Sequence, residues 1–435
     1  MDDAGGPIEF SASGPLRGTA RIPGDKSISH RALICAAMAR GRSRIEGLSE
    51  SEDVRATAAA LRAMGVRIER DGGAWTVDGV GSGGLLQPQS ALDMVNSGTS
   101  ARLLMGLVAS HPIVAIFTGD SSLSRRPMER VAAPLRRIGA EVRTAPGGRL
   151  PLTVRGLCPA VPATHWMEVP SAQVKSALLL AALNIPGLTR IVEPVPTRDH
   201  SERMLRQFGA DLVVEGEEIV LRGETELEPR SLAVPGDPSA AAFLAVAAAI
   251  IPGSELIVEG VGINPRRAGL FELLRAMGAD LAWSNPRDVE GEPVADLAVR
   301  HSGLRGIEVP PDIAPRMIDE FPIFFVAAAF AEGTTRARGL GELRVKESDR
   351  LATMGQGLRA IGARVEEGED GLVIAGTGGA PLPGGATIDP RLDHRIAMSF
   401  AVAGLHCREP VTLADMTIAD TSFPGFAALL EGLSR

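Results

Sequence analysis

The sequence is poor in cysteine, and its few cysteines are scattered. Cys35, Cys158 and Cys407 are odd in number and lie far apart along the chain. Such a set argues against a disulfide framework and for a reducing compartment. The seven histidines show no paired spacing of the kind that metal ligands have. We therefore expect neither structural disulfides nor a metal site.

A segment that could cross a membrane, or direct the chain to one, is also lacking. The longest apolar run, Ala240 to Ile251, is shorter than the about 20 residues that a spanning helix needs. The start, "MDDAGGPIEF", is acidic and lacks the basic-then-apolar order of a signal peptide. A net charge of −8 argues against a nucleic-acid or anionic-membrane surface. We expect a cytoplasmic protein with no nucleic-acid or membrane partner, whose anionic ligands are held by a local cluster of basic residues.

Nucleotide-binding loops are lacking as well. The stretch "PGDKS" at 23–27 is similar to a phosphate-binding loop, but Asp25 separates Gly24 from Lys26, so the required Gly-Lys pair is missing. No Gly-x-Gly-x-x-Gly segment supports a dinucleotide site either. The expected cofactor content is therefore none.

What the sequence does contain is an internal repeat. Five segments share the pattern Leu-Arg-x-x-Gly and begin at Leu61, Leu135, Leu205, Leu274 and Leu358. Each is typical of an amphipathic helix that ends at a left-handed glycine and is followed by an alternating strand. The closing "FAALLEGLSR" is expected to be a sixth such helix.

A second series of segments alternates with the first. Six Ala- and Leu-rich stretches, such as "SHRALICAAMA" and "DHRIAMSFAVAGL", are apolar nearly all round and are expected to be buried helices. The repeating unit is then strand, buried helix, strand, amphipathic helix and two strands. Because 435 residues are too many for one core, six units predict an α/β protein of two three-unit domains.

A Pro-Gly-Asp-x-Ser frame occurs at 23–27 and again, three units later, at 235–239. We interpret residues near 22–24 and 234–236 as crossings between the domains. One domain would span 23–236, and the other would combine 1–22 with 237–435. The frame itself is expected to be structural, so that Lys26, which the second copy replaces by Pro238, is an addition.

Polar residues gather where the expected buried helices begin. A helix start offers unpaired N–H groups and a partial positive charge, which suit an anion. If the helices of each domain point the same way, these starts meet in the gap between the domains. The basic residues that would line this gap are Lys26, Arg31, Arg126, Arg198, Lys346, Arg350 and Arg395.

Simpler explanations exist for parts of this pattern. Ser29, Ser100 and Asp393 can be helix caps, and "RVKESDRL" from Arg344 can be a solvated helix face. His30 and His394 are expected to be structural hydrogen-bonders. Two carboxylates among the cations, Asp319 and Glu347, nevertheless indicate proton transfer or hydroxyl recognition. The residues alone thus predict acid–base chemistry on two anionic small molecules.

Several segments together resemble the 5-enolpyruvylshikimate-3-phosphate synthase family. They are "PGDKSISHR", "NSGTSAR", "GDSSLSRRPMER", "SAQVKSALLLAAL", "RVKESDRL" and "LDHRIAMSFAVAGL". Their order matches, and the similarity runs from about residue 14 to the end. The resemblance implies two inverse α/β domains, each of three βαβαββ units, with the active site in the inter-domain cleft. It also implies a monomer.

The resemblance implies transfer of the enolpyruvyl group of phosphoenolpyruvate to the 5-hydroxyl of shikimate 3-phosphate, with release of phosphate. The family's shikimate 3-phosphate ligands would here be Lys26, Ser27, Arg31, Ser171, Gln173, Arg198, Asp319 and Lys346. Its phosphoenolpyruvate ligands would be Lys26, Asn96, Gly98, Arg126, Gln173, Arg350 and Arg395. Asp319 would accept the hydroxyl proton, Glu347 would protonate the methylene carbon, and Lys26 would stabilise the anionic intermediate.

The chain departs from the family pattern at two positions. Thr421 stands where many members have a phosphoenolpyruvate-binding lysine, and Ala172 replaces a common serine. Some glyphosate-tolerant members carry alanine at the position of Gly98, so Gly98 predicts sensitivity to that herbicide.

Two alternatives are left open. The sister UDP-N-acetylglucosamine enolpyruvyl transferases usually have a reactive cysteine in a loop that here, in "GDSSLSRRPMER", has none. A non-catalytic anion-binding relative would be expected to have lost acid–base groups, but Lys26, Asp319 and Glu347 are present.

Overall fold

The structure, a computed structural model, describes residues 6–434, and the chain divides into two compact units. Unit 1 combines the chain up to Pro23 with Pro235–Asp288 and the chain from Pro293 on. Unit 2 consists of Gly24–Val234 and Val289–Glu292. Within the described residues, no helix is both long and apolar enough to cross a membrane.

The chain passes from one unit to the other at each Pro-Gly-Asp-x-Ser frame. β2 (Arg17–Arg21), just before the first frame, pairs in parallel with β15 (Glu255–Gly262) of unit 1. β14 (Ser231–Ala233), just before the second frame, pairs in parallel with β3 (Arg40–Glu46) of unit 2. In both cases the strand stays in one unit while the helix that follows the frame belongs to the other.

The two frames share their backbone geometry, which explains the repeated glycine. A Cβ at Gly24 would lie 1.9 Å from the Gly47 carbonyl oxygen, and one at Gly236 would lie 2.8 Å from the Ile22 side chain. The aspartate after each glycine caps the helix that follows: Asp25 accepts from the Ile28 N–H and Asp237 from the Ser239 N–H. The frame is therefore structural, as the sequence predicts.

Unit 2 contains three four-stranded sheets of one topology. Their strand orders are β14-β3-β5-β4, β6-β7-β9-β8 and β10-β11-β13-β12. In each, the first pair is parallel and the other two pairs are antiparallel. The remaining strands are β4 (Arg67–Asp71), β5 (Ala74–Val80), β6 (Leu92–Asp93), β7 (Val114–Thr118), β8 (Glu141–Ala145), β9 (Arg149–Arg155), β10 (Thr164–Trp166), β11 (Leu188–Val192), β12 (Leu212–Glu215) and β13 (Glu218–Arg222).

The described part of unit 1 repeats this arrangement in one four-stranded and two three-stranded sheets. The orders are β16-β17-β15-β2, β18-β20-β19 and β1-β22-β21. Isolated parallel bridges, Arg305 to Glu332 and Glu308 to Arg336, adjoin the second of these sheets. The strands are β1 (Ile8–Phe10), β16 (Asp280–Val289), β17 (Glu292–Arg300), β18 (Thr334–Ala337), β19 (Arg364–Glu367), β20 (Leu372–Ala375), β21 (Thr387–Ile388) and β22 (Val411–Leu413).

The two predicted helix series are both present. The buried series is α1 (Lys26–Met38), α3 (Gly98–Ala109), α5 (Ala172–Ala182), α7 (Pro238–Ile250), α10 (Phe321–Phe330) and α12 (His394–Gly404). The amphipathic series is α2 (Glu52–Ala63), α4 (Glu129–Arg137), α6 (His200–Gln207), α8 (Gly269–Ala276), α11 (Arg350–Ala360) and α13 (Phe426–Leu433). A short extra helix, α9 (Ala314–Met317), precedes α10. The predicted α/β repeat architecture is confirmed.

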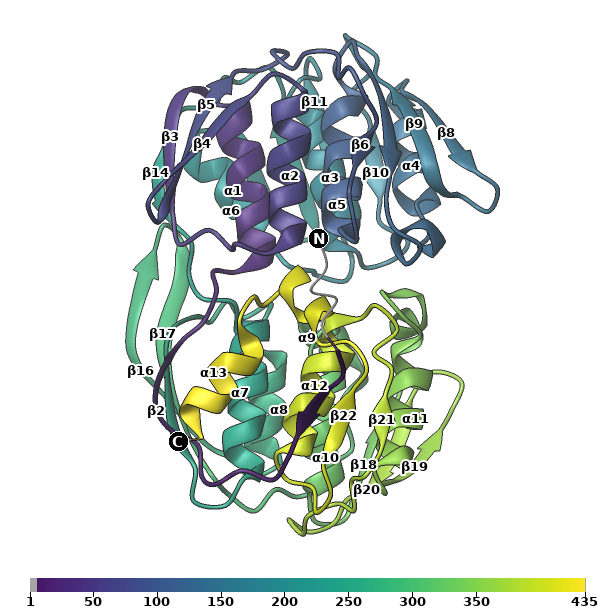
Figure 1. Ribbon diagram of the computed structural model, residues 1–435. Coiled ribbons are helices and arrows are strands. Elements are labelled where there is room, and N and C mark those ends of the chain that lie inside the picture. The colour runs from purple at the N-terminus through teal and green to yellow at the C-terminus, as the bar shows by residue number, and fades with distance from the viewer. Residues whose placement is uncertain (1–5, 435) are drawn as a thin grey trace. The chain divides into compact units, whose positions relative to one another are not determined.

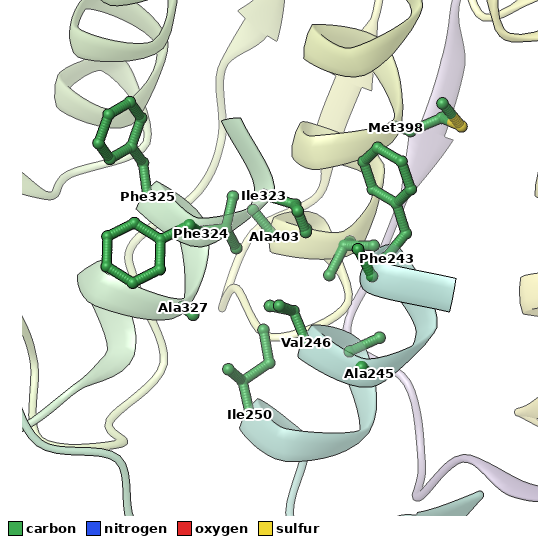
Figure 2. Packing of buried hydrophobic residues seen from close by; sticks show 14 of the residues in the cluster. Phe243, Ala245, Val246, Ile250, Ile323, Phe324, Phe325, Ala327, Met398 and Ala403 are labelled. Carbon is green, nitrogen blue, oxygen red and sulfur yellow. The ribbon is translucent and has the colours of Figure 1, made fainter. Parts of the chain in front are cut away.

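Each unit is organised around its own core of buried helices. In unit 2, α1, α2, α3 and α5 run alongside one another (Figure 1). In unit 1, Phe243 and Val246 of α7 face Ile323 of α10 and Ala403 of α12 (Figure 2), and all four are at most 2% exposed. Burying such side chains stabilises by about 1.5–3 kcal/mol each. The starts of these helices, where the polar residues lie, are thus fixed to a rigid core.

Candidate functional site

In unit 2, hydrogen bonds link the starts of neighbouring helices. The His30 ring of α1 bonds the Thr57 hydroxyl of α2 at 2.8 Å, and Thr57 in turn bonds Ser100 of α3 at 2.7 Å. Burial, followed by the charges of Lys26 and Arg31, lowers the pKa of His30 well below its ordinary value. His30 is thus a neutral structural hydrogen-bonder, as expected.

The helix caps differ in part from the expectation. Asp25, Ser97 and Ser171 accept from the N–H groups of α1, α3 and α5, respectively. Ser29 and Ser100 are therefore not the caps; Ser29 Oγ instead accepts from the Ser49 N–H at 3.0 Å. In each case the side chain that caps the helix lies about one turn earlier in the sequence. A run of several residues that can all act as caps does not show which of them does so. Asp393, in contrast, does cap α12.

Arg31 is held at the junction of three helices. Its Nε donates to Ser201 Oγ of α6 and its Nη2 to Ser176 Oγ of α5, both at 2.6 Å. Burial lowers the pKa of Arg31 to about 10, while the carboxylates of Glu202 and Asp25 raise it and the charge of Arg198 lowers it. The structure therefore brings Arg198 close enough to Arg31 for their charges to interact.

Lys26 begins α1 and contacts an acidic partner that the sequence did not identify. Its Nζ lies 2.7 Å from Asp53 Oδ2 in the first turn of α2, and both side chains are mostly buried. Ser27, Ser171, Gln173 and Arg198 are half-buried. These side chains are therefore within reach of a ligand.

A second group of cations lies at the start of α3. Arg126 Nη2 donates to Asn96 Oδ1 at 2.6 Å, and Arg102 Nη1 donates to Gln173 Oε1 at 2.7 Å. A Cβ at Gly98 would lie 3.0 Å from Nη1 of both Arg102 and Arg126. The missing side chain of Gly98 thus lets two guanidinium groups approach each other, although like charges repel. Such a pair is a suitable binding place for a small anion.

In unit 1, the acidic residues gather around one buried arginine. Arg350, at the start of α11, is 1% exposed. Its guanidinium lies 2.6 Å from Glu347 Oε2, 2.8 Å from Asp393 Oδ2 and 3.4 Å from Asp319 Oδ1. Lys346 Nζ lies 3.4 Å from the same oxygen of Asp319.

The carboxylates around Arg350 keep its guanidinium protonated. Burial by itself lowers the pKa of Arg350, but the carboxylates of Asp393, Glu347 and Asp319 more than offset it, and the net pKa is raised. The alternative that "RVKESDRL" is a solvated helix face is therefore wrong for Arg350. Arg350 points into the protein interior because it donates a hydrogen bond to Asp393, which lies 43 residues away along the chain.

Arg395, in the first turn of α12, has a carboxylate neighbour that the sequence analysis missed. Its Nη1 lies 4.0 Å from Glu320 Oε1, and Glu320 is 2% exposed. The same Glu320 oxygen accepts a short hydrogen bond from Ser239 and lies 3.7 Å from Arg267 Nη2. Arg395 therefore sits beside a buried, internally balanced charge cluster.

Thr421, which stands at the position of the family's lysine, lies in a short 3₁₀ helix, Thr417–Thr421. Its hydroxyl donates to the Ile418 carbonyl at 2.7 Å and lies 3.3 Å from His394 Nδ1. His394 is thus a structural hydrogen-bonder, as expected.

Each predicted site residue therefore belongs to one of the two units. Unit 2 carries Lys26, Ser27, Arg31, Asn96, Gly98, Arg126, Ser171, Gln173 and Arg198, and unit 1 carries Asp319, Lys346, Glu347, Arg350 and Arg395. Arg102, Asp53 and Glu320 were missed. A signal existed for Arg102, because it follows Gly98 by one helical turn. Among the described residues, no group of three or more His, Cys, Asp or Glu side chains is arranged to hold a metal ion.

Comparisons with known proteins identify the family of the chain. A family model described as EPSP synthase (3-phosphoshikimate 1-carboxyvinyltransferase) matches residues 10–430. The 3-phosphoshikimate 1-carboxyvinyltransferase of Sphingopyxis alaskensis is 62% identical over 444 residues and covers 100% of both chains. That of Novosphingobium aromaticivorans is 60% identical over 438 residues and covers 99% of both.

Solved structures show the same relation. The EPSP synthase from Acinetobacter baumannii matches with a TM-score of 0.87 at 45% identity, over 98% of each chain. The enolpyruvyl transferase NikO from Streptomyces tendae matches with a TM-score of 0.77 at 22% identity, over 99% of this chain and 98% of its own; that likeness concerns the fold. With its sequence matched from end to end and its two-unit fold shared, the chain belongs to the EPSP synthase (3-phosphoshikimate 1-carboxyvinyltransferase) family.

Proposed function

We propose that this protein transfers the enolpyruvyl group of phosphoenolpyruvate to the 5-hydroxyl of shikimate 3-phosphate and releases phosphate. The observation that carries the proposal is the cluster in which Asp319 and Glu347 both lie against the buried Arg350. A reaction that removes a proton from an alcohol and adds one to a carbon needs two such groups. Membership of the family supports the choice of substrates.

In this proposal Asp319 accepts the proton of the 5-hydroxyl, whose oxygen attacks the enol carbon of phosphoenolpyruvate. Glu347 delivers a proton to the methylene carbon, which becomes a methyl group, and a tetrahedral intermediate forms. Loss of a proton from that methyl group and departure of phosphate restore the double bond. The cations Lys26 and Arg350 stabilise the anionic intermediate, because fixed charges at a site poor in water act strongly.

We assign the anionic groups of the substrates to residues of both units. Shikimate 3-phosphate contacts Lys26, Ser27, Arg31, Ser171, Gln173, Arg198, Asp319 and Lys346. Phosphoenolpyruvate contacts Lys26, Asn96, Gly98, Arg126, Gln173, Arg350 and Arg395. The guanidinium forks of Arg31 and Arg126 donate hydrogen bonds to Ser176 of α5 and to Asn96, respectively. So held, they are suited to bind phosphate or carboxylate in two-point contacts.

We further propose that the enzyme acts as a cytoplasmic monomer. The three scattered cysteines support a reducing compartment. Size-exclusion chromatography with light scattering tests the monomer, and a mass near twice 45.5 kDa would contradict it.

Phosphate release from phosphoenolpyruvate by the purified protein tests the function. We expect release with shikimate 3-phosphate as acceptor and none with UDP-N-acetylglucosamine. Glu347→Gln, which keeps the shape but cannot donate the proton, should lower kcat by about 10²–10⁴-fold. A matched change at an exposed carboxylate of unit 1, Glu308→Gln, should leave kcat unchanged. Release only with the nucleotide sugar would overturn the choice of acceptor.

A further inference from the structure

Lys175 is a buried charge that no step of the proposed reaction uses. It lies in the first turn of α5, and its side chain is 0% exposed. Its Nζ lies 2.8 Å from Glu193 Oε2 and 2.8 Å from Glu202 Oε1. A lysine is costly to bury unless it is paired. Here one cation joins α5 both to α6 and to the end of β11.

The Glu202 side of this junction lies next to Arg31. Ser176 follows Lys175, and Ser201 precedes Glu202; both hydroxyls accept a hydrogen bond from the Arg31 guanidinium. Ser201 also donates to Ser176 at 2.7 Å. The ion pair between Lys175 and Glu202 therefore fixes the spacing of the two helices whose serines hold Arg31. Among the charges around Arg31, which include Asp25, Arg198 and Cys35, Glu202 contributes most to raising its pKa.

The Glu193 side of the junction leads to Arg198. Glu193 directly follows β11 and accepts a short hydrogen bond from the Thr197 hydroxyl. Thr197 immediately precedes Arg198, so this bond ties down the loop that carries the second arginine. Two cations, Lys175 and Arg31, are matched by two carboxylates, Glu193 and Glu202.

We propose that Lys175 is a positioning residue, which through Glu202 and Glu193 orients Arg31 and Arg198 toward one anionic substrate. This inference rests on the proposed function and deepens it. It states that residues which do not touch the shikimate 3-phosphate anion hold in place the arginines that bind it. Lys175 itself touches no substrate. Its removal should therefore weaken binding of one substrate and leave the chemistry and the other substrate nearly unchanged.

The variant that tests this is Glu202→Gln. It breaks the link to α6 but leaves Lys175 paired with Glu193, so the protein should still fold, as circular dichroism melting would verify. We expect the KM for shikimate 3-phosphate to rise by about tenfold, since a small displacement of a charged clamp is costly. The KM for phosphoenolpyruvate and kcat should each change by less than about twofold. Lys175→Met should show the same split in a stronger form.

Glu292→Gln is the matched control. Glu292 is also a buried carboxylate, and it pairs with α6 through His200 at 2.7 Å instead of through Lys175. We expect it to leave both KM values unchanged. An equal rise in this control would overturn the proposal, because the effect would then be a general loosening of α6.

A double-mutant cycle supplies the decisive readout. If Glu202 acts through Arg31, Glu202→Gln should weaken binding of shikimate 3-phosphate little further once Arg31→Ala is present. Fully additive losses would overturn the proposal. An inactive wild type would instead refute the proposed function, whereas an active wild type with an unaltered Glu202→Gln variant would refute this inference alone.

Discussion

The two Pro-Gly-Asp-x-Ser frames have the same backbone but opposite surroundings. In the first, Lys26 and Ser27 are partly exposed and precede a row of residues assigned to substrates. In the second, Ser239 is 4% exposed and donates to Glu320. Arg267 completes the second frame by donating to Asp237 at 3.1 Å and to Ser239 at 2.8 Å.

This difference shows two ways to satisfy a helix start that favours an anion: a ligand can bind there, or a carboxylate of the chain can take its place. Both frames begin a buried helix, and both helix starts favour negative charge. In unit 1 the carboxylate of Glu320 supplies that charge from within the chain. In unit 2 we propose that the substrate supplies it. The fold therefore uses the frame twice, whereas we propose that the reaction uses only the copy that keeps a lysine.

The largest expected effect comes from removing that lysine. Lys26→Met should lower kcat/KM by about 10³-fold, because a fixed cation no longer faces the developing negative charge. Pro238→Ala, at the same position of the second frame, should leave kcat/KM within about twofold. Steady-state phosphate release measures both. Similar losses in the two variants would show that the frame matters through its fold and not through the charge.

The next effect concerns the two glycines. An alanine at Gly24 would meet the Gly47 carbonyl oxygen, a backbone atom, at 1.9 Å, so Gly24→Ala should cost about 3 kcal/mol of the free energy of unfolding. Gly236→Ala should cost less, about 1–2 kcal/mol, because its nearest contacts are the Ile22 side chain at 2.8 Å, which can shift, and the Gly260 carbonyl oxygen at 2.9 Å, which is much less close than 1.9 Å. Urea unfolding of the two variants measures the difference. Equal costs would contradict the comparison.

Acid should destabilise the protein through a buried histidine of unit 2. His165, 2% exposed in unit 2, has its pKa lowered from 6.5 to about 4 by burial and by the charge of Arg137. The unfolded chain thus takes up a proton at this position as the pH falls through 6.5, whereas the folded chain resists it until about 4. The contribution of neutral His165 to the free energy of unfolding is therefore complete above pH 6.5, and about 2 kcal/mol of it is lost by pH 5.

His165→Leu should remove this loss. Calorimetry at pH 7.5 and pH 5 should show a smaller acid-induced drop in Tm for the variant than for the wild type. His301 of unit 1 is exposed, and partial burial and the charge of His406 also lower its pKa. His301→Leu is therefore the comparison variant, and it should reduce the acid-induced drop in Tm by less than His165→Leu does. An unchanged acid sensitivity in His165→Leu would contradict the assignment.

The smallest effect is expected at Gly98. A methyl group there would lie 3.0 Å from the guanidinium groups of Arg102 and Arg126, and would narrow the place we assign to phosphoenolpyruvate. Gly98→Ala should raise the inhibition constant of glyphosate by about tenfold, or about 1.4 kcal/mol. The KM for phosphoenolpyruvate should rise less, because that ligand is smaller. An unchanged inhibition constant would contradict the prediction.

Much of the fold was predictable from local pattern. The Leu-Arg-x-x-Gly repeats end helices at Gly65 and Gly139, whose φ angles of 92° and 100° are left-handed. The closing segment forms the expected helix α13. Such features depend on residues within one or two turns of each other, so periodicity and turn residues are sufficient to predict them.

The hydrogen bonds and ion pairs that hold the site residues in place were less predictable. Ser29 and Ser100 lie among other hydroxyl residues, and sequence spacing cannot tell which of these reaches the free N–H groups of the helix. The partners of Arg350 and Arg102, namely Asp393 and Gln173, are 43 and 71 residues away. Pairing over such separations depends on how helices pack.

The sequence by itself determined the six α/β units, the two frames and the residues that can carry charge at helix starts, because these follow from local periodicity, capping and composition. Only the tertiary structure decided which charges meet. Packing sets Glu320 beside Ser239 and Lys175 between two carboxylates. Buried charges are stable only when matched, and the matching partners come from distant parts of the chain that only the folded core brings together.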